Sequence, residues 1–143
     1  MVVGLHKVIN DIRVDAEFQY KFNVMSDGSA TGKSYLLKLL EKSFLIDGNV
    51  KCIRIDYRHA KLSEAERISM IKGKDIILMD NIELYITKEL IQSISDSSAM
   101  AIMAGRNLKG IRFEPIAFYG IKFTSTELRT NLHGGYGIDE TYF

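Results

Sequence analysis

One run near the start of the chain has the composition and spacing of a phosphate-binding loop. It reads DGSATGKS, from Asp27 to Ser34, and it lies between an apolar stretch and a helix-like pattern of leucines. Successive backbone N–H groups in such a glycine loop form a cup for anions, and the helix N-terminus adds the positive end of its dipole. We expect Lys33 to reach the outer phosphates and the Ser34 hydroxyl to hold Mg²⁺. The residues predicted to contact the nucleotide are Asp27, Gly28, Ser29, Ala30, Thr31, Gly32, Lys33, Ser34 and Tyr35.

The first position of this loop departs from the usual G-x-x-x-x-G-K-S/T pattern. Asp27 stands where that pattern has its first glycine, and Gly28 follows one position later. A carboxylate beside phosphates is unfavourable unless it points away, although aspartate tolerates left-handed backbone angles better than most residues. Two interpretations therefore stay open. Asp27 replaces the glycine in conformation, or Gly28 takes the special angle and the loop is one residue tighter. The Gly32-Lys33-Ser34 part of the pattern is intact.

A second run, IILMD from Ile76 to Asp80, has the pattern of a strand that ends in a metal ligand. Its continuous apolar residues suit a strand that is buried on both faces of a parallel sheet. In open α/β folds, ligands bind at the carboxyl edge of such a sheet, which is where the closing acid would lie. We therefore expect Asp80 to hold the Mg²⁺ shell opposite Ser34.

The rest of the chain alternates between patterns typical of strands and of helices. Residues 2–14, with a turn signal at Asn10-Asp11, fit an edge hairpin or a short helix, and the hairpin is the prediction. Ser63 with Glu66, and Thr87, are predicted helix caps. Strands are predicted over residues 20–25, 50–57, 75–80 and 99–104, and residues 110–113 and 116–123 are also rich in β-forming residues. Helices are predicted over 33–43, 63–72 and 87–94. Residues 124–131 are polar and carry nothing diagnostic. Strands that alternate with helices indicate an α/β domain, and we expect a single domain over residues 1–143.

The two motifs give the chain a resemblance to P-loop NTPases. DGSATGKS resembles a Walker A element and IILMD a Walker B element. The chain looks most like small members of the additional-strand branch, which includes the AAA+ and RecA-like ATPases. The resemblance covers residues 20–106, and residues 50–57 fit the strand that intervenes between the two motifs in that branch. It implies a three-layer P-loop fold with a mainly parallel sheet of about five strands and possible β additions at both ends. It also implies ATP and Mg²⁺ as cofactors.

The catalytic set that this resemblance implies is incomplete. The branch usually has glutamate directly after the Walker B aspartate, as the base that orients the attacking water, whereas this chain has Asn81. An amide can position a water molecule but cannot take its proton. Glu83 is either a displaced base or an exposed start of the next helix, and Arg106 is either a phosphate sensor or a plain strand-end arginine. We expect Lys33, Asp80, Asn81, Glu83 and Arg106 to carry weak or partner-dependent Mg-ATP hydrolysis.

Two other functions stay open from the residues alone. Small P-loop kinases bind their acceptor near the end of the second strand, where this chain has Asp56 to activate a hydroxyl and Arg58 to clamp an anion; a plain polar loop also fits. A nucleotide-switched module that binds nucleic acid or protein is the other, because basic residues lie near aromatic ones at 57–61, with further basic residues at 72–74 and 106–112. The absence of a guanine-reading N-K-x-D sequence favours ATP over GTP.

Composition excludes several broader classes. The 143 residues carry a net charge of +1, which gives no long-range attraction to nucleic acid. The single cysteine, Cys52, cannot form an internal disulfide, which fits a cytoplasmic location. No stretch approaches the length of a transmembrane helix or has the pattern of a signal peptide, so no membrane association is expected.

The expected partners are the nucleotide and a second copy of the chain or another protein that completes the site.

Overall fold

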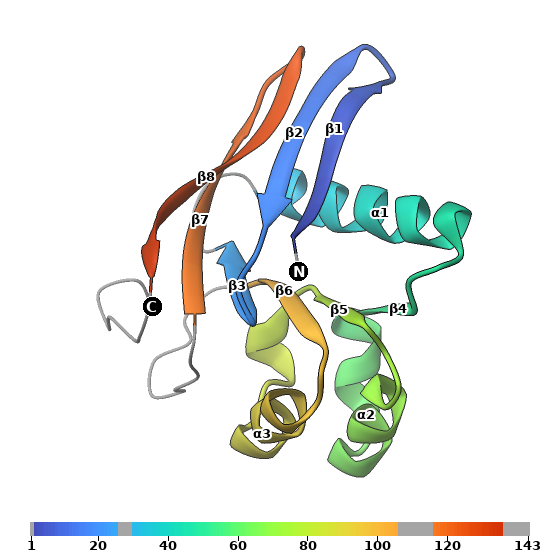
Figure 1. Cartoon of the computed structure of the whole chain (residues 1–143). Helices are drawn as coiled ribbons and strands as arrows, with labels where there is room; N and C mark the ends of the chain where they lie inside the picture. Colours follow the sequence, from blue (N-terminus) through green and yellow to red (C-terminus); the bar gives the residue numbers. More distant parts are fainter. Residues whose placement is uncertain (1, 26–29, 106–115, 136–143) are drawn as a thin grey trace.

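The computed structural model describes residues 2–25, 30–105 and 116–135. These residues form eight strands, three α-helices and two short 3₁₀ turns (Figure 1). The strands are β1 (Val3–Ile9), β2 (Ile12–Phe18), β3 (Phe22–Met25), β4 (Cys52–Ile55), β5 (Ile76–Met79), β6 (Met100–Ala104), β7 (Ile116–Phe123) and β8 (Glu127–Gly135). The helices are α1 (Ala30–Asp47), α2 (Glu64–Ile71) and α3 (Lys88–Asp96), and the turns are η1 (Tyr57–Lys61) and η2 (Ile82–Leu84).

The described strands belong to one mixed sheet with the order β1-β2-β8-β7-β3-β6-β5-β4. The neighbours from β7 to β4 in that order pair in parallel, and β2 also pairs in parallel with β8. The pairs β1–β2 and β7–β8 are antiparallel. Figure 1 shows how the sheet curls, with β1, β2, β7 and β8 rising away from the remaining strands.

The predicted architecture, a three-layer P-loop fold with a mainly parallel sheet of about five strands, is wrong. The described sheet has eight strands of mixed direction and curls into a half-barrel. The additional strands come from the first hairpin, in which buried and exposed residues alternate, and from β8. The inward residues of β2, Val14, Ala16 and Phe18, are buried in the cluster that also holds the leucines of α1. The apolar surface of α1 is therefore covered by a sheet that extends and bends around it.

Apolar residues on both faces of the parallel strands hold the helices in place. Leu36, Leu37 and Leu40 of α1 are almost completely buried and pack in one cluster with β2, β5, β6 and β7. The second cluster lies on the other face and includes Ile71 of α2 and Ile94 of α3. Complete burial of one such side chain stabilises the fold by about 1.5–3 kcal/mol, so this packing fixes α1 firmly against the strands that end at the site.

Three local predictions are confirmed. The first hairpin turns at Asn10 and Asp11, whose φ angles of 50° and 65° are those of a tight hairpin turn. Ser63 and Glu66 form the predicted capping box of α2. The Thr87 hydroxyl accepts a backbone hydrogen bond of 3.1 Å at the start of α3. In each case, short-range hydrogen bonding decides the conformation, so the sequence pattern is sufficient.

Candidate functional site

The candidate site lies at the carboxyl edge of the parallel strands. In the register of the sheet, Met25 at the end of β3 pairs with Ala104 of β6, and Met79 at the end of β5 pairs with Met103 of β6. The three strands therefore end at one edge, where α1 begins after β3 and Asp80 follows β5. This is the edge at which open α/β sheets bind their ligands.

The two predicted metal ligands are in direct contact at this edge. The Ser34 hydroxyl donates a hydrogen bond of 2.7 Å to Oδ2 of Asp80. The other carboxylate oxygen, Oδ1, accepts a hydrogen bond of 3.0 Å from the backbone N–H of Asn81. Asp80 is only 9% exposed, so its carboxylate is held in a fixed orientation. Hydroxyl and carboxylate oxygens are ligands that Mg²⁺ prefers, together with water and phosphate oxygens.

A hollow of about 270 Å³ lies against this pair. It is lined by Lys33, Ser34, Asp80, Asn81, Glu83, Ala104 and Gly105. Lys33, in the first turn of α1, is 5% exposed. The start of an α-helix carries backbone N–H groups and a partial positive charge, both of which favour an anion. The hollow therefore combines a buried cation, a helix start and a carboxylate–hydroxyl pair.

Glu83 lines this hollow from η2, and Gly105 at the end of β6 makes room for it. A Cβ atom added at Gly105 would lie 2.8 Å from Oε2 of Glu83 and would also overlap the Ile82 side chain. Glu83 is exposed in the first turn of η2 and also borders the hollow, so both interpretations from the sequence, a displaced base and an exposed helix start, fit its position.

Gly105→Ala is expected to destabilise the protein and to displace the Glu83 carboxylate, because the added methyl group meets both Ile82 and Glu83. Overpacking of this kind costs about 1–3 kcal/mol. Urea unfolding of the variant and the wild type measures that cost directly. Equal free energies of unfolding would show that the end of β6 and η2 separate freely, which would contradict the close approach.

The backbone conformation at Asn81 disfavours a glutamate base directly after Asp80. Its φ of 53° and ψ of 43° lie in the left-handed region, which asparagine adopts more easily than most residues. A glutamate at this position would cost about 1–2 kcal/mol in backbone strain. The same sharp turn directs the Asn81 N–H back to the Asp80 carboxylate.

Tyr85 is a buried residue of the site that the sequence patterns do not reveal. Its hydroxyl lies 2.6 Å from the backbone carbonyl oxygen of Asp80 and 3.3 Å from that of Ile55. Burial raises the pKa of Tyr85, so the hydroxyl stays protonated and remains a donor. Tyr85 therefore joins the ends of β4 and β5 and fixes the backbone that carries Asp80.

Asp56, at the end of β4, lies outside this hollow. Its carboxylate contacts Arg58 Nε at 3.1 Å and Arg54 at 3.0 Å. The hydrogen bonds from Arg58 hold the pKa of Asp56 well below its usual range. A carboxylate that binds protons so weakly is a poor general base, so this geometry does not favour Asp56 for activating a hydroxyl group.

The remaining predicted residues are placed as follows. Asp27, Gly28, Ser29 and Arg106 lie outside the described residues, and the backbone of Ala30 and Thr31 forms the start of α1. A Cβ atom added at Gly32 would lie 3.0 Å from Cβ of Phe123, so α1 approaches β7 closely there. The Tyr35 ring packs on Phe123 with 5.6 Å between ring centroids, so this packing places it in the core around α1 and not in the hollow.

Neither the protein-family models nor the curated proteins gave a match to this chain. Within residues 2–25, 30–105 and 116–135, no group of three or more His, Cys, Asp or Glu residues could hold a metal ion by itself. In the same ranges, no helix is long and apolar enough to cross a membrane. What the site binds must therefore be inferred from its own residues.

Proposed function

We propose that the chain binds Mg·ATP in the hollow beside Ser34 and Asp80 and hydrolyses it slowly or with the help of a partner. One observation carries the proposal: the Ser34 hydroxyl and the Asp80 carboxylate are 2.7 Å apart at the edge where the parallel strands end. Lys33 and the start of α1 lie beside them. These groups match the two halves of Mg·ATP, because Lys33 and the helix start suit phosphates whereas the oxygen pair suits Mg²⁺.

The expected rate of hydrolysis follows from the groups that would act on the water molecule. Asn81 cannot accept a proton, and Glu83 is the carboxylate that lines the same hollow. Phosphoryl transfer is accelerated when a further cation neutralises the charge that develops on the transferred group. A second copy of the chain or another protein would supply that cation, in the cytoplasmic location that the sequence suggests.

The adenine preference rests on the sequence, which has no guanine-reading N-K-x-D segment. A small-molecule kinase is not proposed, because the carboxylate that would activate its acceptor, Asp56, is held by two arginines. Hydrolysis by water needs no such acceptor and uses groups that already line the hollow.

The test is the Mg²⁺ dependence of ATP affinity in the wild type and in Asp80→Asn. The asparagine keeps the shape of the side chain but loses the charge that stabilises the metal. We expect the affinity in excess Mg²⁺ to fall about 10- to 100-fold, the usual cost of losing a group that orients a metal shell, and the affinity in excess EDTA to change little. Released phosphate is followed in the same samples.

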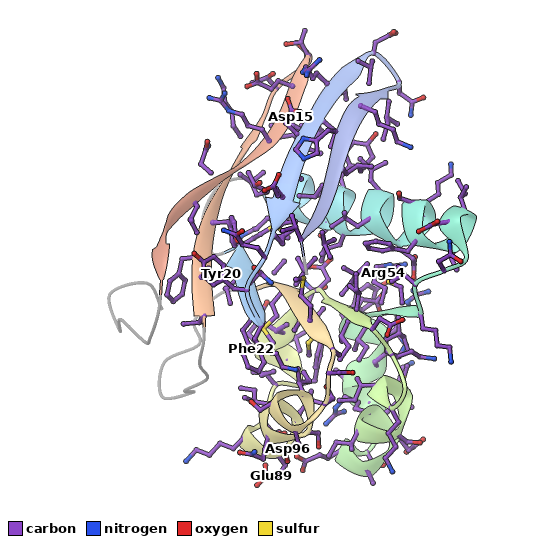
Figure 2. The ribbon with its side chains drawn as sticks, viewed as in Figure 1. Asp15, Tyr20, Phe22, Arg54, Glu89 and Asp96 are labelled. Carbon is purple, nitrogen blue, oxygen red and sulfur yellow. The ribbon has the colours of Figure 1, made fainter. Side chains whose placement is uncertain are left out.

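Asp96→Asn is the matched control, because Asp96 lies on α3 (Figure 2), where it accepts an exposed hydrogen bond of 2.8 Å from the Gln92 side chain. The proposal is wrong if the wild type does not bind ATP. It is also wrong if Asp80→Asn lowers the affinity equally with and without Mg²⁺.

A further inference from the structure

A second hollow, of about 370 Å³, adjoins the proposed nucleotide site. The two hollows share Ser34, Asp80 and Asn81 as a common wall. On its other side, the second hollow is lined by residues that play no part in the proposed function: Lys38, Arg54, Asp56, Tyr57 and Arg58. They come from α1, from β4 and from the turn η1 that follows β4.

A buried carboxylate holds the two arginines at this hollow. Asp56 is 5% exposed, and its Oδ2 accepts hydrogen bonds of 3.0 Å from Arg54 and 2.8 Å from Arg58. Its Oδ1 accepts a further bond of 3.0 Å from the backbone N–H of Arg58. Both oxygens of Asp56 are therefore engaged, and the carboxylate acts as an anchor for guanidinium groups.

Another arginine, Arg67, fixes the turn η1 that carries Arg58. Arg67 of α2 is 8% exposed, and its guanidinium donates to the backbone carbonyl oxygens of His59 and Ala60 at 3.1 Å and 3.3 Å. Because its backbone and one edge of its guanidinium are already held, Arg58 loses less conformational entropy when it binds a ligand than an unrestrained side chain would.

The cations at this hollow differ in how far their side chains are exposed to solvent. Arg54, labelled in Figure 2, is 15% exposed and pairs with Glu41 at 3.0 Å as well as with Asp56, the carboxylate that it shares with Arg58. Arg58 is 60% exposed, and Lys38 is exposed on α1. Arg58 and Lys38 are therefore the cations at this hollow that are accessible to an anion from solvent.

An exposed aromatic ring stands next to these cations. Tyr57 is 62% exposed and lines the same hollow. An exposed large aromatic side chain beside an arginine fork is suited to a ligand that has a flat apolar body and an anionic group, because the ring stacks on the one and the fork binds the other.

We propose that this second hollow binds a phosphomonoester, with its phosphate on Arg58 and Lys38 and its flat body on Tyr57. A phosphomonoester carries close to two negative charges at neutral pH. Lys38 and the edge of the Arg58 guanidinium that does not contact Asp56 are the groups that its phosphate oxygens would meet. The inference goes beyond the proposed function, because binding here does not need a nucleotide in the first hollow.

The test is a calorimetric titration with phenyl phosphate and with inorganic phosphate, for free protein and for protein saturated with Mg²⁺ and a non-hydrolysable ATP analogue. We expect one equivalent of phenyl phosphate to bind in both cases, more tightly than inorganic phosphate. Arg58→Gln is expected to weaken both ligands about 10- to 100-fold, the loss of one charged pair. Tyr57→Ala is expected to weaken phenyl phosphate about two- to tenfold and to leave inorganic phosphate unchanged.

Lys38→Gln is the second variant, because it removes a cation without touching the contacts of Asp56, and it should also weaken both ligands. Lys72→Gln is the control, since Lys72 is exposed at the end of α2 and lines neither hollow. A short 5′-phosphorylated oligonucleotide that binds through Arg58, while its unphosphorylated counterpart does not, would support the same site with the end of a nucleic acid as the source of the phosphate.

Three results would overturn the inference. The first is that phenyl phosphate does not bind. The second is that its affinity is the same in the wild type, in Arg58→Gln and in Lys38→Gln. The third is that it competes with the nucleotide analogue for one site. Failure of the proposed function looks different. In that case the nucleotide analogue does not bind, while phenyl phosphate still binds the free protein and responds to Arg58→Gln.

Discussion

Glu83→Gln is expected to reduce the rate of ATP hydrolysis by about 10²- to 10⁴-fold, the range that a general base contributes, while ATP affinity stays unchanged. Glu83 lines the hollow that holds Lys33, Ser34 and Asp80, and Gly105 has no side chain to displace it. Glutamine keeps the size and the hydrogen-bonding reach of the side chain but cannot accept a proton. The chemical step should therefore be lost without a loss of binding.

Single-turnover release of phosphate from ATP measures the chemical step directly, and ATP affinity is measured on the same preparations. Glu89→Gln is the matched control, because Glu89 is an acid in the first turn of α3, at the lower end of the molecule in Figure 2, and lines neither hollow. Equal rates for Glu83→Gln and the wild type would remove Glu83 from the reaction. A fall in ATP affinity of the same size would show instead that Glu83 organises the site.

The parts of the site that the sequence predicted are those that depend on neighbouring residues in the chain. Gly32-Lys33-Ser34 at the start of a helix, and Asp80 at the end of an apolar strand, are each recognised within a few positions. Their contact across 46 positions followed from one further rule, that parallel strands end at a common edge. The sequence patterns are therefore sufficient to place Ser34 close to Asp80.

The prediction of the overall architecture was wrong because the strands outside the parallel group show only weak strand patterns in the sequence. β8 begins in the polar residues 124–131, and its place between β2 and β7 depends on pairing with residues far away in the chain. The curl of the sheet depends on how Phe18 and the leucines of α1 fill one cluster. Packing of this kind is decided by tertiary contacts, which override local patterns.

Tyr85 and Gly105 show a second limit. Tyr85 acts through a hydroxyl that reaches the backbone of two strands, and Gly105 acts by having no side chain next to Glu83. Neither belongs to a motif, and a lone tyrosine or glycine in the sequence has many roles. Only the contacts in space distinguish these positions from ordinary core and turn residues.

Lys33→Ala is expected to weaken ATP binding about 10- to 100-fold, because one charged hydrogen bond is worth about 1.5–3 kcal/mol. Lys33 is 5% exposed and lines the proposed nucleotide hollow, so its charge acts where water screens it little. The backbone N–H groups at the start of α1 remain in the variant, and the Ser34–Asp80 pair is untouched. Some affinity should therefore persist, and it should still depend on Mg²⁺.

Lys42→Ala is the matched control, because Lys42 lies on the same helix and lines neither the nucleotide hollow nor its neighbour. Lys33→Met keeps most of the buried side-chain volume and separates the effect of the charge from that of packing. If both Lys33 variants fold and bind ATP as tightly as the wild type, the nucleotide does not lie at the start of α1. If only Lys33→Ala loses affinity, the side chain matters for packing and its charge does not contact the phosphates.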